Sequence, residues 1–261
     1  MNSNPDSAIA MSHELMAESW DKNHEFGVVQ SNYILGYIYD KIQVDYSNAI
    51  IFYLEAIRYA ENSDYQNVSN DLISLYKNCG VIFRKFNAFD LAIEYYEKSL
   101  TLAKDVNDED QIVSISYNMA GLFSEMNRKL EAIELLEEIS NQLESKHPKY
   151  FNLNNRLSQI YLDANQFLKA KSLTQKILKA GEPGTRELID SYQILGRVAL
   201  IENQPAEAEK YFEIALQTAL LEKEDYIRDK ALFETFSDLG TLNLLTQNSN
   251  QAIDFFLRAE N

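Results

Sequence analysis

The chain has 261 residues, of which 46% are hydrophobic, and contains only eight glycines and four prolines. This composition supports a continuous core and favours helix over sheet, so we expect an all-α protein. The 40 acidic and 24 basic residues give a formal net charge of −16, which repels phosphate backbones and excludes nucleic acid as an expected partner. No apolar run reaches about 18 residues, so we expect no membrane insertion of this segment.

The single cysteine, Cys79, cannot form an internal disulfide and lies in an apolar helical stretch, where we expect it to be buried. The start of the chain has no basic region followed by an apolar signal core. These features favour a cytoplasmic location. An extracytoplasmic location would require that the chain is a fragment whose signal peptide is absent.

A first amphipathic helix is predicted near the start of the chain. Ala8, Ser12 and Leu15 are spaced so that they share one helical face. The same spacing recurs in the second half of each later repeat. We therefore interpret residues 1–20 as a half repeat, a second helix that lacks its first.

The stretch from Gly80 to Ser99 contains one complete repeat. Gly80 and Phe83 lie three positions apart on one face of a first helix, and Asn87 interrupts the pattern where a turn is needed. Ala92 and Tyr96 then begin the seam of a second amphipathic helix. The unit is therefore a pair of helices joined by a short turn.

Six such repeats follow the half repeat, and we expect all of them to form a single solenoid over residues 1–261. The repeats cover approximately residues 24–62, 64–104, 108–144, 148–180, 183–221 and 224–260. Small residues let the two helix backbones of a repeat approach closely, while an aromatic residue fills the neighbouring gap. We predict these structural anchors: Gly36, Ala49, Ala56, Gly80, Ala92, Ala120, Ala132, Ser158, Ala170, Gly196, Ala208, Ala215, Gly240, Ala252 and Ala259.

The pattern resembles the tetratricopeptide repeat, which has a Leu-Gly pair, an aromatic residue, then Ala, an aromatic residue and Ala. Leu35-Gly36, Leu195-Gly196 and Leu239-Gly240 match the first pair. The small residues of successive repeats are 38 to 44 positions apart, against about 34 in the family. Repeats of this length resemble those of kinesin light chains and bacterial signalling proteins.

This resemblance implies a right-handed α-α superhelical solenoid of stacked helix pairs. It also implies a scaffold that binds a protein or peptide in its concave groove, as the sensory or docking module of a larger signalling protein. First helices line the inner face of such a solenoid. The residues predicted to line the peptide-binding groove are Lys77, Asn78, Arg84, Lys85, Tyr117, Asn118, Asn155, Arg156, Gln193 and Arg197.

This predicted groove combines amides, basic groups and one aromatic ring. Amides can bond the main chain of an extended peptide, and basic groups attract its carboxylates. The expected partner is therefore a peptide or protein segment, including one with carboxylates.

We expect no enzyme, no metal and no cofactor. His13, His24 and His147 are scattered, and none has a second ligand residue at a metal-binding spacing. Neither a phosphate-binding glycine loop nor a nucleophile elbow occurs in the sequence.

Two alternatives to a peptide-binding scaffold stay open. Phe255, Phe256 and Leu257 follow one another in the last predicted helix, which suggests an apolar, uncapped end. Either the chain is part of a longer protein, or the array acts as a spacer or self-association element. The second alternative is a regulatory phosphatase-like signalling protein, by resemblance to long-repeat bacterial proteins, although no catalytic residue is identifiable.

Overall fold

The computed structural model describes residues 5–22 and 24–260. Within these ranges it contains thirteen α-helices and no strand, which confirms the predicted all-α fold class of stacked helix pairs. Residues 1–4 of the predicted half repeat, and Asn261 at the end of the predicted solenoid, lie outside the described residues.

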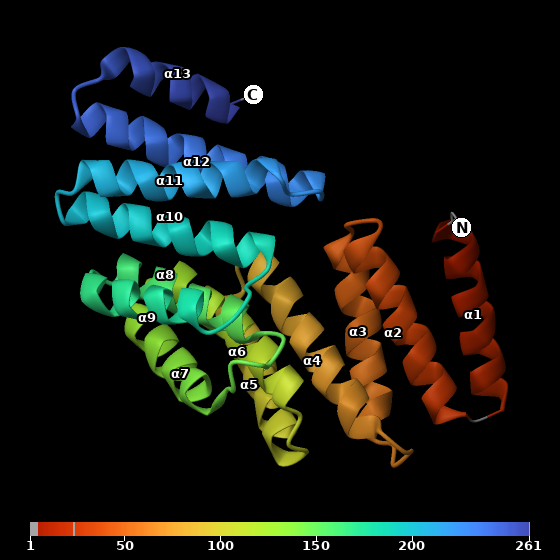
Figure 1. Ribbon diagram of the computed structural model, residues 1–261. Helices are drawn as coiled ribbons and strands as arrows, with labels where there is room; N and C mark the ends of the chain where they lie inside the picture. Colours follow the sequence, from red (N-terminus) through yellow and green to blue (C-terminus); the bar gives the residue numbers. More distant parts are fainter. Residues whose placement is uncertain (1–4, 23, 261) are drawn as a thin grey trace. The chain divides into compact units, whose positions relative to one another are not determined.

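The helices form two compact units, residues 1–126 and residues 127–261. The N-terminal unit contains α1 (Pro5–Asp21), α2 (Glu25–Lys41), α3 (Tyr46–Ala60), α4 (Val68–Lys85), α5 (Phe89–Asp105) and α6 (Glu109–Glu125). Each helix packs on the next one along the chain, and α4 also contacts α6 (Figure 1).

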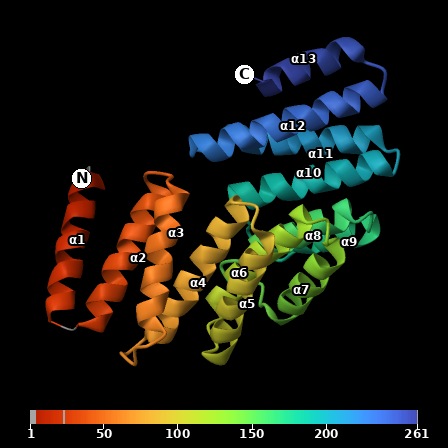
Figure 2. The same cartoon turned by 180° about the vertical axis from the view of Figure 1, so that it is seen from behind.

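The C-terminal unit contains α7 (Lys129–Gln142), α8 (Tyr150–Asp163), α9 (Phe167–Lys179), α10 (Thr185–Ile201), α11 (Pro205–Leu220), α12 (Asp225–Leu245) and α13 (Ser249–Glu260). Sequential helices again pack on each other, and α10 also contacts both α8 and α12. Figures 1 and 2 both show α10 to α13 as consecutive layers.

The helices alternate between two roles. We call α2, α4, α6, α8, α10 and α12 the first helices, and α3, α5, α7, α9, α11 and α13 the second helices. That the two units continue as one array across Met126 stays a prediction.

Each turn from a first to a second helix contains one residue with positive φ. These φ angles lie between 56° and 63° at Val44, Asn87, Asn127, Asn165, Asn203 and Gln247. Asparagine tolerates this left-handed conformation better than other residues with a side chain, apart from glycine. The amide of Ala88 donates to the Phe83 carbonyl at 2.9 Å, and Gln204 bonds Ala199 in the same way, which closes the end of the first helix.

The helix crossings are tightest at the glycine anchors. A Cβ atom on Gly196 would lie 2.3 Å from Cε1 of Phe212, and one on Gly80 would lie 2.7 Å from the Tyr96 ring. Gly36 faces Tyr53 and Gly240 faces Phe256 in the same arrangement. Only glycine lets these rings lie flat against the neighbouring backbone.

The alanine anchors of the second helices are buried, with the exception of Ala259, which is partly buried. The expectation for the seam of α1 is wrong at Leu15, which is 43% exposed. Instead α1 meets α2 through the small buried side chains of Ser12 and Ser19, because Gly27 lies against the Ser19 hydroxyl.

The turn geometry predicts a stabilising substitution. Val44 has φ 56° and an exposed side chain, so its β-branched carbons add strain without adding core contacts. Val44→Asn should raise the free energy of unfolding by about 1 kcal/mol, measured by denaturant unfolding. Asn87→Val is the matched control and should lower it by a similar amount; equal stability of all three proteins would contradict the argument.

The glycine crossings predict a compensated pair. Gly196→Ala should overpack the crossing and destabilise the fold by about 1 to 3 kcal/mol. Phe212→Leu in the same chain should restore part of this loss, because the third repeat carries Ala120 and Leu136 at these two positions. Thermal unfolding of the two single variants and the double variant measures the coupling, and simple additivity would show that the two side chains do not meet.

Candidate functional site

The predicted groove residues all lie on first helices. In the N-terminal unit they are Lys77, Asn78, Arg84 and Lys85 on α4, and Tyr117 and Asn118 on α6. In the C-terminal unit they are Asn155 and Arg156 on α8, and Gln193 and Arg197 on α10. Each unit therefore has its own first-helix face, and we describe the two faces separately.

On the N-terminal face, the basic side chains of α4 have acceptors within the protein. Arg84 Nε donates to Glu125 Oε2 of α6 at 2.8 Å, and Lys77 Nζ donates to Gln111 Oε1 at 2.8 Å. The hydrogen bond from Arg84 to Glu125 raises the pKa of the guanidinium further. The charge of Arg84 is therefore balanced by a carboxylate of the next first helix, and Lys77 bonds an uncharged amide there.

Lys85 lies at the edge of this face and turns towards α3. Its Nζ donates to the Tyr46 hydroxyl at 2.6 Å and lies 3.9 Å from the centroid of the same ring. Asp40 Oδ1 is 4.0 Å away. Asn78, Tyr117 and Asn118 are half-buried beside these contacts.

On the C-terminal face, two of the predicted amides are buried between first helices. Asn155 Nδ2 donates to the Glu187 carbonyl at 2.7 Å, and Asn155 Oδ1 accepts from the Ser191 hydroxyl at 2.9 Å. Gln193 Nε2 donates to Thr235 Oγ1 at 2.9 Å. Because neighbouring first helices approach closely here, their polar groups need partners inside the fold.

Arg197 joins three first helices. Its Nε donates to Asp238 Oδ1 on α12 at 2.9 Å, and its Nη1 donates to Gln159 Oε1 on α8 at 3.3 Å. Burial lowers the pKa of Arg197, but Asp238, Glu234 and Asp163 together raise it above its ordinary value, so the guanidinium stays charged. Arg156 is half-buried on α8.

Sequence reasoning missed the acidic and amide partners of these basic residues. Arg84 and Glu125 are 41 positions apart, as are Arg197 and Asp238. In both pairs an arginine on one first helix is followed by a carboxylate 41 positions later, on the next first helix. This constant separation in the sequence is the signal that could have identified the pairs.

A small cavity of about 100 Å³ lies between α10 and α12 on the C-terminal face. Asp190 lines it, and burial raises the pKa of this carboxyl to about 6. The positive charges of Arg186 and Lys230 oppose this increase, while Glu234 and Glu187 add to it.

The described residues contain no group of three histidine, cysteine, aspartate or glutamate side chains placed to hold a metal ion. Across the same residues, no helix has the length and apolarity needed to cross a membrane.

Comparison with known families agrees with this architecture. A model described as a tetratricopeptide repeat matches residues 29–63, and the predicted resemblance is confirmed: the chain is a tetratricopeptide repeat (TPR) protein. A second model, described as the SusR N-terminal TPR domain, matches residues 54–227, more than half of the sequence. The protein belongs to this SusR-type TPR family.

Several solved structures share the fold. BtubC (BKLC) from P. vanneervenii has 18% identity and a TM-score of 0.68, with 83% of this chain and 91% of that chain covered. The apo quorum sensor NprR from B. thuringiensis has 13% identity and a TM-score of 0.63, with 97% and 83% covered. Apo RapI has 10% identity and a TM-score of 0.64, with 96% of both chains covered. No curated protein matches the sequence.

The partly buried carboxyl of Asp190 predicts a pH-dependent change in stability. Because its pKa is higher in the folded chain than in the unfolded chain, ionisation is unfavourable in the fold, and the cost develops as the pH rises from about 4 to about 6. Asp190→Asn should therefore raise the free energy of unfolding by about 1 to 2 kcal/mol at pH 7 and leave it nearly unchanged at pH 4. Thermal unfolding at both pH values measures this, and a gain of equal size at both would exclude the ionisation as its cause.

Proposed function

We propose that this TPR scaffold binds an extended peptide or protein segment along its first-helix faces, as the sensory or docking module of a larger signalling protein. TPR folds of this kind are scaffolds for protein interactions. The family description, an N-terminal domain, supports a place within a longer protein. The description of the structurally similar NprR as a quorum sensor supports a sensory role.

The arrangement of charge on the two faces is the observation that carries this proposal. Arg84 with Glu125, and Arg197 with Asp238, place a guanidinium beside a carboxylate on neighbouring first helices. A guanidinium has five N–H donors, and a carboxylate has several acceptor sites, so such a pair retains capacity for further hydrogen bonds. An extended peptide main chain presents donors and acceptors alternately and suits a face that offers both.

This balance of charge also refines the expected ligand. A carboxylate of the peptide would compete with Glu125 for Arg84 and with Asp238 for Arg197. We therefore propose recognition mainly through the main chain of the peptide, with carboxylates of the peptide as a secondary contribution.

Self-association is the second candidate function. Ile253 and Leu257 lie one turn apart on α13, and each is more than half exposed. Such a pair favours contact with another apolar surface. Light scattering over a concentration series separates self-association from peptide binding, because self-association predicts a mass that rises with concentration and falls back in Ile253→Glu.

The phosphatase-like interpretation gains no catalytic group from the described residues.

Charge reversal on the first-helix faces tests peptide binding. Peptides selected from a random phage-displayed library on the full chain should bind at least about tenfold more weakly to Arg84→Glu or to Arg156→Glu, because each change places a carboxylate against the peptide. The Arg84 ion pair is partly exposed and contributes at most about 1 kcal/mol to stability, so circular dichroism should show an unchanged fold.

Lys98→Glu is the matched control. Lys98 is an exposed residue of the second helix α5, where it pairs with Glu94, so its reversal changes the net charge equally but leaves the first-helix faces intact. Its affinity for the selected peptides should equal that of the unmodified chain. Equal binding by all variants would exclude the first-helix faces as the binding site.

A further inference from the structure

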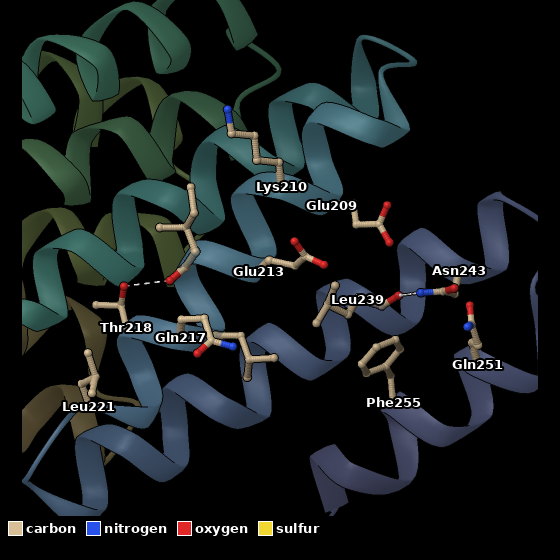
Figure 3. A pocket seen from close by; sticks show the side chains of 12 residues that line it. Glu209, Lys210, Glu213, Gln217, Thr218, Leu221, Leu239, Asn243, Gln251 and Phe255 are labelled. Atoms are coloured by element: carbon tan, nitrogen blue, oxygen red, sulfur yellow. Dashed lines mark hydrogen bonds between the residues drawn. The ribbon is translucent and has the colours of Figure 1, made fainter.

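An open groove lies in the C-terminal unit between two second helices. It has a volume of about 670 Å³ and is bordered by α11 and α13, with α12 beneath (Figure 3). Leu239 forms a buried part of its floor, and the ring of Phe255 lies at the wall contributed by α13. Glu209 and Glu213 stand one turn apart on α11 and face the same space.

An equivalent groove occurs two repeats earlier, between α7 and α9 over α8, with a volume of about 550 Å³. Glu137 occupies the place of Glu213, since each lies five residues after the alanine anchor of its second helix. Glu137 accepts hydrogen bonds from the Tyr161 hydroxyl and from Lys169 Nζ, the latter at 3.0 Å. These two donors lower the pKa of Glu137 and connect the three helices across the groove.

The groove at α11 lacks both of these donors. By position in the repeat, Asn243 replaces Tyr161 and Gln251 replaces Lys169. Asn243 Nδ2 donates to the Leu239 carbonyl of its own helix at 2.9 Å instead of reaching towards α11. Within the described residues, neither Glu209 nor Glu213 has a hydrogen bond or an ion pair, and Lys210 extends away from them in Figure 3.

The missing aromatic ring changes the lining of the groove rather than opening it, because the groove lined by Tyr161 still has a volume of about 550 Å³. The residue three positions after the small anchor of the first helix is aromatic in each of the first four repeats: Tyr39, Phe83, Phe123 and Tyr161. Asparagine at position 243 is shorter, and both Asn243 and Leu239 are buried at the base of the groove. The groove therefore combines an apolar floor with two carboxylates that are not neutralised.

We propose that this groove binds a segment of a partner protein that carries a lysine or arginine next to an apolar side chain. The cation of the partner occupies the place that Lys169 takes beside Glu137, and binds Glu213 with support from Glu209. Its apolar side chain lies against Leu216 and Phe255, which line the groove and are partly exposed. The net charge of −16 attracts such a cationic segment, and the site is separate from the first-helix faces.

A subtractive selection tests this proposal. A random phage-displayed peptide library is selected on the full chain, and binders to the double variant Asn243→Tyr with Gln251→Lys are removed, because this variant recreates the bridged groove of α7 to α9. The remaining peptides should contain lysine or arginine beside an apolar residue. Fluorescence polarisation should show at least about fivefold weaker binding to Glu213→Gln, and weaker binding as salt increases.

Two controls make the result specific. Glu137→Gln removes the equivalent carboxylate of the bridged groove, and Glu94→Gln removes an exposed carboxylate of the second helix α5; neither should change the affinity of these peptides. Circular dichroism checks that every variant is folded, and Glu213 is exposed, so its replacement should not affect folding.

Three outcomes would overturn the proposal. The selection could yield no peptide that distinguishes the chain from the double variant, or it could yield peptides without a basic residue. Peptide binding could also be unaffected by Glu213→Gln. If light scattering shows instead a dimer that the double variant dissociates, the groove holds a second copy of the chain and the cationic partner is excluded.

Discussion

The close crossing of two helices at a small residue is the constraint on which the rest of this structure depends. At Gly80 and Gly196 even one methyl group would collide with the ring of Tyr96 or Phe212. The contact of a ring with a bare backbone sets how closely the two helices of such a pair approach. Residues in the left-handed conformation, asparagine in four of the six turns, then lead the chain from each first helix into its second helix.

This packing brings neighbouring first helices together, and the contact determines the chemistry of their faces. Polar side chains between the helices must have partners, so Gln193 bonds Thr235 and Arg197 bonds Asp238. The result is a face of mixed charge that is held in place before any ligand arrives. Side chains that are already ordered lose less entropy on binding, which favours a role in recognition.

The repeats also differ from one another at individual positions. Grooves at equivalent places in two repeats therefore have different side-chain linings. Tyr161 and Lys169 bridge one groove between second helices, whereas Asn243 and Gln251 leave the equivalent groove open. The two grooves differ in whether a carboxylate is paired with a cation. Glu137 pairs with Lys169, whereas no cation among the described residues forms an ion pair with the exposed Glu213.

The sequence by itself determined the helix pairs, the glycine crossings and the family, because these depend on spacings of three and four residues within a single helix or turn. It also located the first-helix faces. Only the tertiary structure decided which residues of those faces meet, since partners such as Arg84 and Glu125 are 41 positions apart and depend on how far one helix is shifted along the next. For the same reason the burial of Asn155, the exposure of Leu15 and the open groove beside Glu213 could not be read from local periodicity.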